Sequence, residues 1–456
     1  MNQMSEQRSL QHVAGTLLIE ARAAFLNGAG LGSGEDRTTT LHKTFREGQR
    51  SVPYVSAQAW RRWLRSTLIE ETGWPSSEIR AIAWNPRGNT SKVAGYVDPV
   101  DFAEDDLFGY MRAAEGQGKR VSEADAVVVG DDDADDDETA DFDAGKISAV
   151  MRASPLATSV LASIRSDGWQ GRDDGFVHVQ SHDPDALELA EWMRAIETAD
   201  VPNGRQDAFK KKREGLKKQI KGKQTEDALK IVRAFVTEHQ IPGRSPMPNP
   251  QSPLPYSTRF FNSHLEGIFC LDYARVGVFW NLGDRKELDP PRVNAWMKEG
   301  KIEVAEDRGP LGKIYRVKDR SVAAERSRRL IQALAVLRGG AKQAAFGTDV
   351  APKALILAGL SCGNPIFNRL FTDHGEGPRL NTRRLTEIVA DYANRIATPV
   401  FVGIREGYLD NQDEVRQLPS TDQDVSTSEL RAELARASFV VCTPLQAAAW
   451  MAEWLR

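Results

Sequence analysis

Between Thr16 and Leu26, apolar side chains recur at every second position, with Glu20 and Arg22 between them. This period of two predicts a half-buried β-strand, because successive side chains of a strand point to opposite faces of a sheet. Apolar runs near 354–359 and 399–404 predict further strands in the last third of the chain. We therefore expect strands from both ends of the chain to join one sheet.

Helical patterns alternate with these strands. The first follows a loop rich in glycine, with Ser56 as its N-cap, and a short helix is expected at Glu104–Arg112. The stretch 148–164 predicts one or two strands around Pro155, and a long, strongly basic helical region follows His182. Further helices are expected near 321–337, 382–396, 428–436 and 444–456, the last with the N-cap pair Thr443 and Pro444. Few strands mixed with several helices indicate an α+β fold.

The formal net charge of −4 conceals an uneven distribution. Residues 121–145 hold 11 acidic and no basic side chains, so the remainder of the chain carries a net charge of +7. Such an acidic stretch has little to bury, and we expect a disordered insertion there. A mildly basic body permits binding to phosphates through Coulomb attraction and counterion release.

Membrane, secretory and metal-binding classes find no support in the sequence. No apolar run approaches the roughly 20 residues that cross a bilayer, and the first residues lack the pattern of a secretory signal. The 3 cysteines have no metal-type spacing. We expect a soluble, cytoplasmic protein with no metal, no cofactor and no membrane partner.

The most informative stretch follows the glycine loop. At 100° per residue it places basic and amide side chains on one helix face and Trp60, Trp63, Leu64 and Leu68 on the other. A helix N-terminus beside guanidinium groups suits a phosphate chain, although an ordinary solvated basic face has the same pattern. The candidate phosphate-binding residues here are Ser56, Gln58, Arg61, Arg62 and Arg65 on the helix, and His42, Lys43, Arg46 and Arg50 in the arm before it.

Two glycine-containing segments are further candidates. The loop that begins at Asn27 lacks the ending of a P-loop, yet its glycines, including Gly28 and Gly30, can approach a sugar-phosphate chain closely. It could equally be a flexible hairpin tip. The segment Leu337–Gln343 has paired glycines and projects Lys342 and Gln343, although a glycine at this position is normally a helix stop.

Taken in order, several of these segments resemble one known family. They are the strand, the glycine loop, PYVSAQAWRRWLR, DLFGYM, SPLPYSTRFFNSHLEGIFCLD and LRGGAKQ. The sequence resembles the DevR-type autoregulator family of the RAMP superfamily, the backbone subunit of type I CRISPR Cascade complexes. The resemblance spans most of residues 14–370, and PYVSAQAWRRWLR and LRGGAKQ are its most specific parts.

The resemblance implies a modified RRM-like (ferredoxin-like) palm with finger and thumb insertions. Residues 1–120 would form the first part of the palm and the RNA-gripping fingers, and 121–145 the acidic insertion. Residues 146–255 would hold the finger and thumb region with the basic helical insertion. Residues 256–456 would complete the palm and add a C-terminal α/β segment.

The resemblance also implies a function, which is that of a scaffold and not of an enzyme. Such a subunit binds the CRISPR RNA guide (crRNA) along its phosphate backbone, stacks head to tail with copies of itself, joins other Cascade subunits, and reaches target DNA by way of the guide. Ser56, Gln58, Arg61 and Arg62 would contact phosphates, Asn27 and the glycine loop would line the groove, and Lys342 would close it. A thumb hairpin would have its tip among Arg244–Pro253, with Met247 as a wedge between bases.

Two alternatives remain open. Type III backbone subunits of the same superfamily cut target RNA with an acid in the first loop, and Asp36 is suitably placed, although a single acid is thin support for metal-assisted hydrolysis. A transcriptional regulator is the other alternative, but no helix-turn-helix pattern supports it.

The acidic insertion yields the first testable prediction. Deleting Val128 to Phe142 should leave folding intact, because so acidic a stretch has almost nothing to bury. Thermal unfolding of the deletion variant measures this directly. A large drop in the unfolding temperature would mean that the segment is part of the folded core.

Overall fold

The computed structural model describes residues 9–33, 38–77, 79–84, 90–95, 97–112, 149–165, 169–176, 184–199, 206–247, 255–418 and 439–456. The chain divides into two compact units, Met1–Asp173 with Thr258–Arg456, and Asp174–Ser257. The described residues 149–165 and 169–173 fall in the larger unit. Within the described part of the chain, no helix is both long and apolar enough to cross a membrane.

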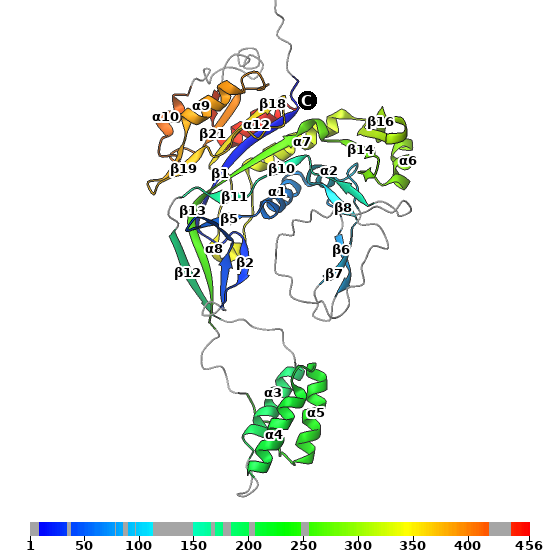
Figure 1. Ribbon diagram of the computed structural model, residues 1–456, viewed down its shortest axis with the longest axis vertical. Helices are drawn as coiled ribbons and strands as arrows, with labels where there is room; N and C mark the ends of the chain where they lie inside the picture. The colour runs from blue at the N-terminus through cyan, green and yellow to red at the C-terminus, as the bar shows by residue number, and fades with distance from the viewer. Residues whose placement is uncertain are drawn as a thin grey trace, which may run out of the picture. The chain divides into compact units, whose positions relative to one another are not determined.

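The larger unit is built on one long central strand. β1 (His12–Ala24) pairs antiparallel with β13 (Pro255–Asp272) on one side and with β18 (Ala354–Leu360) on the other. Figure 1 shows β1 and β13 side by side although they lie far apart in the sequence. The expectation that strands from both ends of the chain share one sheet is confirmed.

The expected half-burial of the first strand is wrong over Thr16–Ile19. Val13 to Ile19 are buried without a break. Leu17 packs into a core with helices on one face of the sheet, while Leu18 packs into a second core on the other face. Both faces are covered here, so polar alternation begins only near Glu20, and at Ala23 the backbone is left-handed (φ 46°) at a β-bulge.

Over the described residues the main sheet has twelve strands, and its longest path runs β22-β21-β18-β1-β13-β11-β5-β4. Along the chain, the central elements follow the order β1, α1 (Ala57–Thr72), β11 (Leu161–Ser163), β13, α7 (Arg320–Ala335), β18. β11 pairs with β13, β13 with β1, and β1 with β18, each antiparallel. Helices α1 and α7 contribute to the same core on one face. The predicted α+β class is confirmed.

The remaining strands of this sheet extend it beyond the centre. They are β2 (Gly28–Leu31), β3 (Thr39–His42), β4 (Thr44–Glu47), β5 (Arg50–Val55), β10 (Leu156–Thr158), β12 (Trp169–Phe176), β21 (Val400–Ile404) and β22 (Phe439–Cys442). Two short hairpins stand apart from it, β6 (Ile79–Trp84) with β7 (Thr90–Gly95) and β19 (Phe371–Asp373) with β20 (Pro378–Leu380).

The C-terminal elements cover both faces of the sheet edge. α9 (Thr382–Asp391) and α10 (Gln412–Arg416) contribute to one core, and α12 (Pro444–Ala452) contributes to the other. Thr443 caps α12 in a capping box with Gln446, so the predicted cap pair is confirmed. The helix expected near 428–436 lies outside the described residues.

A second sheet has the order β16-β17-β14-β15-β9-β8 among the described strands. Its members are β8 (Tyr110–Arg112), β9 (Val150–Arg152), β14 (Val278–Leu282), β15 (Arg285–Lys286), β16 (Ile302–Asp307) and β17 (Gly312–Val317), with α6 (Pro290–Lys298) beside them. Two 3-10 turns, Tyr273–Arg275 and Gly309–Leu311, flank β14 and β17. The acidic segment 121–145 lies outside the described residues, between β8 and β9 in the sequence.

The helix expected at Glu104–Arg112 is shorter than predicted. α2 covers Ala103–Phe108, and Gly109 ends it with a left-handed backbone (φ 73°). A side chain at Gly109 would collide with the backbone of residues 152–154, so this close approach also requires glycine. Residues 110–112 then form β8.

A fully buried ionic network joins α2 to the rest of the unit. The Arg152 guanidinium pairs with Asp106 and, at 3.1 Å, with Glu287, and all three side chains are 0% exposed. Arg326 of α7 donates to the same Asp106 at 2.8 Å. Backbone oxygens of Val278 and Arg275 accept further hydrogen bonds from Arg152, so the buried charges are paired and hydrogen-bonded.

The smaller unit, Asp174–Ser257, is helical. It contains α3 (Pro184–Glu197), α4 (Gln206–Ile220) and α5 (Thr225–Glu238), which pack around a small apolar core that includes Ile196, Leu216 and Val232. The predicted helical region after His182 is confirmed. On α4 the side opposite Leu216 is exposed and carries several lysines with no ion pair to a described residue: Lys210, Lys211, Lys218 and, just beyond the helix, Lys221.

The buried network yields a stability prediction. Arg152→Met should lower the free energy of unfolding by about 3–5 kcal/mol, because the buried oxygens of Asp106, Glu287, Val278 and Arg275 all lose the hydrogen bonds that Arg152 donates. Chemical denaturation measures the change. The control is Arg329→Met, which removes an exposed ion pair with Glu325 and should cost only about 0–1 kcal/mol. Equal losses in the two variants would contradict the prediction.

Candidate nucleic-acid interface

The end of β1 meets the start of α1. The Asn27 side-chain amide donates to Ser56 Oγ at 3.3 Å, and Ser56 Oγ accepts from the backbone N–H of Ala59 at 3.4 Å as the N-cap. The predicted cap is confirmed, and two predicted site residues lie in contact. Helix N-termini favour negative charge, since their first N–H groups lack intrahelical partners. This corner of the larger unit therefore suits an anion.

The loop Leu337–Gln343, which contains the glycine pair, is hydrogen-bonded both to the segment that follows β1 and to α1. Ala341 N–H donates to the Leu26 carbonyl at 3.1 Å, and Arg338 N–H donates to Thr67 Oγ1 at 3.0 Å. Gly339 lies so close to the Trp63 indole that a side chain there would collide with it. Gly340 has a left-handed backbone (φ 107°). α7 ends earlier, at Ala335 with Val336 as its C-cap, so the two glycines are not its stop signal; they let the loop approach α1.

A groove of about 490 Å³ runs between α1 and this loop. One wall is the exposed side of α1 and the other is the loop backbone, with the end of β1 between them. Two arginines enter it, Arg62 from α1 and Arg338 from the loop. The lining residues are Leu26, Asn27, Ala59, Arg62, Trp63, Ser66, Glu70, Arg338, Gly339, Gly340 and Ala341.

The three arginines of α1 have different roles. Arg61 donates to the Phe108 carbonyl at the end of α2 at 3.0 Å, and Arg65 pairs with Glu104 of α2 at 2.5 Å. The hydrogen bond to Glu104 raises the pKa of Arg65. Arg62 is exposed and forms no hydrogen bond or ion pair with any described residue. On the predicted basic face, only the Arg62 guanidinium is therefore available to bind a ligand among these three arginines. Arg61 and Arg65 hold α1 to α2.

The predicted polar residue of this face, Gln58, is exposed on the first turn of α1. Trp60, on the opposite side, is fully buried and donates from its indole N–H to the Ser159 carbonyl at 2.7 Å. Trp63 lies half-buried between the core and the groove. The division of α1 into an inner and an outer face follows the prediction for these residues.

Lys342 and Gln343 lie just past the groove, at the start of α8 (Gln343–Phe346). Lys342 Nζ donates to Thr258 Oγ1 at 2.5 Å and lies 5.2 Å from the centre of the Phe25 ring. The Gln343 amide donates to the carbonyls of Gly339 and Thr348. Lys342 is exposed beside β13, whereas Gln343 holds the loop closed.

His42 does not face the solvent. Its side chain is 6% exposed, its ring centre is 4.8 Å from that of Phe261, and Nδ1 lies 3.3 Å from the Arg259 carbonyl. Burial lowers its pKa, so the ring is neutral at pH 7. A buried neutral imidazole is poorly placed to contact a phosphate, which argues against the predicted role.

The arm and the glycine loop form two hairpins. Gly28 and Gly30 lie on β2, which pairs with β3, and Gly30 has a left-handed backbone (φ 91°). Lys43 follows β3, and its N–H donates to the Asn27 carbonyl at 2.9 Å, which ties the arm to the site. Arg46 is exposed on β4, across from Ser51 on β5. Asp36 lies outside the described residues.

Met247 belongs to the helical unit. Its side chain is 46% exposed, and the residues before it run along α3: Arg244 pairs with Glu191 at 3.5 Å, and Arg194 donates to the Pro246 carbonyl at 2.7 Å. Residues 244–247 therefore do not form the expected hairpin tip, and 248–254 lie outside the described residues. β12 does pair with β13, and the chain between these two strands builds the helical unit.

The acidic residues of α2 are internal. Glu104 pairs with Arg65 and accepts from Ser77, while burial raises the pKa of its neighbour Asp105. Within the described ranges, no group of three His, Cys, Asp or Glu side chains could hold a metal ion. Glu104 thus holds α1 to α2, whereas Asp105 accepts hydrogen bonds from the Ser77 hydroxyl and the Asp98 N–H.

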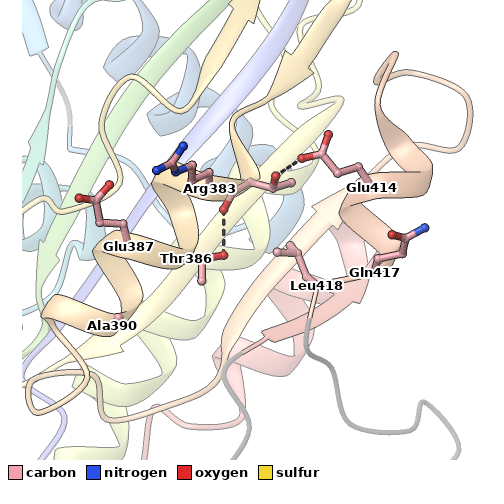
Figure 2. Close-up of a pocket in the computed structure, with 8 residues that line it drawn as sticks. Arg383, Thr386, Glu387, Ala390, Glu414, Gln417 and Leu418 are labelled. Carbon is pink, nitrogen blue, oxygen red and sulfur yellow. Dashed lines mark hydrogen bonds between the residues drawn. The ribbon is translucent and has the colours of Figure 1, made fainter.

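A second groove, of about 630 Å³, lies between α9 and α10 (Figure 2). Arg383, Thr386 and Glu387 of α9 line one side, and Glu414 and Gln417 line the other. Its two carboxylates outnumber its single guanidinium, so it suits an anionic ligand less well than the groove beside α1.

No protein-family model matches the chain, and no curated protein matches its sequence. Two solved structures are similar along nearly the whole length. A chain described as "CRISPR RNA-guided surveillance complex" has 11% identity and a TM-score of 0.39, over 97% of this chain and 99% of that chain. Another, described as "CRISPR RNA-guided surveillance complex, pre-nicking", has 11% identity and a TM-score of 0.41, over 97% of this chain and 100% of that chain.

Proposed function

We propose that this chain is an RNA-binding backbone subunit of a type I CRISPR Cascade complex. The observation that carries the proposal is the groove beside α1. It assembles Asn27, the start of α1, Arg62 and the paired-glycine loop, which come from the segments that resemble the DevR-type family. A cationic groove next to a helix N-terminus is suited to a sugar-phosphate backbone.

The palm of this proposal is RRM-like. The order β1, α1, β11, β13, α7, β18, with antiparallel neighbours and both helices on one face, is consistent with the β-α-β-β-α-β connectivity of ferredoxin-like folds. In this arrangement the groove lies at the end of β1, where α1 begins. The fingers would be the hairpins β2–β3 and β4–β5, which carry Lys43 and Arg46.

The proposed role is to grip the guide without reading its bases. Guanidinium groups and backbone N–H groups recognise phosphates, which every nucleotide offers. Base pairing of the guide would then select target DNA, and head-to-tail contacts between copies would propagate along the strand. Sequencing the RNA that co-purifies with the protein tests this: guides derived from CRISPR repeats are expected, and random fragments would contradict it.

Arg62 is the residue to test in the groove. Arg62→Ala should weaken binding to single-stranded RNA severalfold, and should lower the slope of log K against log salt by roughly 0.7, since one phosphate contact is lost. Fluorescence anisotropy over a salt series measures both. Substituting Arg62 alone is cleaner than substituting Arg61 as well, because Arg61 also holds α2.

The matched control for Arg62 is Arg329→Ala. Arg329 is an exposed arginine of α7 outside the groove, paired with Glu325, so its loss removes the same charge from another surface. We expect this variant to bind RNA as the unchanged protein does. Equal losses of affinity in the two variants would show an effect of net charge and would remove the groove from the proposal.

A scaffold should leave its bound RNA intact. With Mg²⁺ or Mn²⁺ present, the guide-loaded complex should not cut a complementary RNA, and Asp36→Ala should change neither this result nor guide binding. Gel electrophoresis of labelled RNA measures cleavage. Regular, metal-dependent cuts that disappear in Asp36→Ala would favour the type III endoribonuclease instead.

A further inference from the structure

One end of the groove carries an ionic cluster of Arg338, Glu70 and Glu71. Arg338 Nη1 lies 2.8 Å from Glu70 Oε2, and the other terminal nitrogen of Arg338 pairs with Glu71. The three side chains are 51%, 58% and 43% exposed. Exposed ion pairs are weak because water and salt screen them, so a competing anion can replace either carboxylate.

The backbone of Arg338, in contrast, is firmly placed. The Arg338 N–H donates to Thr67 Oγ1 at 3.0 Å. The Arg338 carbonyl oxygen lies 3.4 Å from the same hydroxyl. Thr67 is 0% exposed. Gly339, the residue that follows Arg338, lies against the Trp63 side chain. The Cα of Arg338 is therefore fixed relative to α1, while its guanidinium is held only by exchangeable partners.

Arg338 shares the groove with Arg62. On α1, Arg62, Ser66 and Glu70 are spaced by four residues and line the same wall of the groove. Eight residues of helix span about 12 Å, so the Glu70–Arg338 cluster lies roughly that far along α1 from Arg62. An extended phosphate chain that enters at the N-terminus of α1 and passes Arg62 would next meet Arg338.

We infer that Arg338 is a second phosphate-binding residue of this groove, and that Glu70 and Glu71 hold its side chain until an RNA phosphate replaces them. The inference rests on the proposed function and adds to it. The two carboxylates act as an internal competitor. They keep the guanidinium positioned but make each phosphate displace an anion, which lowers the affinity of the groove for single-stranded RNA.

Anisotropy with a labelled oligouridine, over a salt series, tests the inference on the full chain. Arg338→Ala should weaken binding severalfold and flatten the salt slope by roughly 0.7, while Arg338→Lys, which keeps the charge, should retain most of the slope. Glu70→Gln with Glu71→Gln should tighten binding by about two- to fivefold, because the competing anions are gone. Thermal unfolding should show that all variants remain folded, since the backbone bonds to Thr67 persist.

The control for the double glutamine variant is Glu299→Gln with Glu303→Gln. These two acids also form exposed ion pairs, with Lys301 and Arg316, and lie outside the groove. Both double variants lose two negative charges, so tighter binding in the first alone supports a local competitor. Equal tightening in both, or none in the first, would overturn that part of the inference.

The outcome for Arg62→Ala separates failure of this inference from failure of the proposed function. If Arg62→Ala weakens binding and Arg338→Ala leaves affinity and slope unchanged, the groove binds RNA but Arg338 takes no part, and the inference is wrong. If neither substitution changes binding, the groove does not hold RNA and both proposals fail. Loss in both, with rescue by Arg338→Lys, supports the two together.

Discussion

The buried contact between Arg152 and Asp106 determines much of what surrounds the groove. Asp106 lies on α2, and the same carboxylate also binds Arg326 of α7. Because a buried charge without a partner is costly, the two helices cannot shift independently of Arg152. α2 in turn accepts hydrogen bonds from Arg61 and Arg65 of α1. This network therefore supports the orientation of α1 together with the buried side chains of Trp60, Leu64 and Leu68.

The groove is a product of long-range pairing. Its wall on α1 and its wall on the loop at Gly339 are separated by most of the chain, and they meet because β1 lies between β13 and β18 in one antiparallel sheet. The end of β1 supplies the Leu26 carbonyl that binds the loop and the Asn27 amide that binds the helix cap. A shift in the register of β1 would carry both contacts away from the groove.

Local sequence signals predicted the elements well, but they could not predict partners. Ser56 and Thr443 were recognisable as caps because capping depends on residues within one turn. The burial of His42 depends on Phe261 and Arg259, and the engagement of Arg61 and Arg65 depends on α2, all distant in the sequence. The first strand alternates in sequence, yet its second face is covered by C-terminal helices that its own pattern does not reveal.

The contacts of Arg338 could not be predicted from the sequence. Arg338 lies inside LRGGAKQ, whose sequence signals are its paired glycines and its lysine. A single arginine beside glycines predicts no particular contact. Its proximity to Glu70 and Arg62 appears only when the loop is placed on α1. No sequence pattern predicts a role for Thr67 either, although its hydroxyl accepts a hydrogen bond from the backbone of the loop.

The distribution of positive charge is best described by the partners of each cation. Arg152, Arg326, Arg61 and Arg65 are committed to buried or half-buried contacts, so they stabilise the fold and offer nothing to a phosphate. Arg62 and three lysines of α4, Lys210, Lys211 and Lys218, have no ion pair among the described residues, and Arg338 has exchangeable ones. The net charge of the body counts all of these equally. The affinity of a backbone-binding surface for RNA depends instead on how many cations are both exposed and fixed in place, because only they release counterions without a cost in internal contacts.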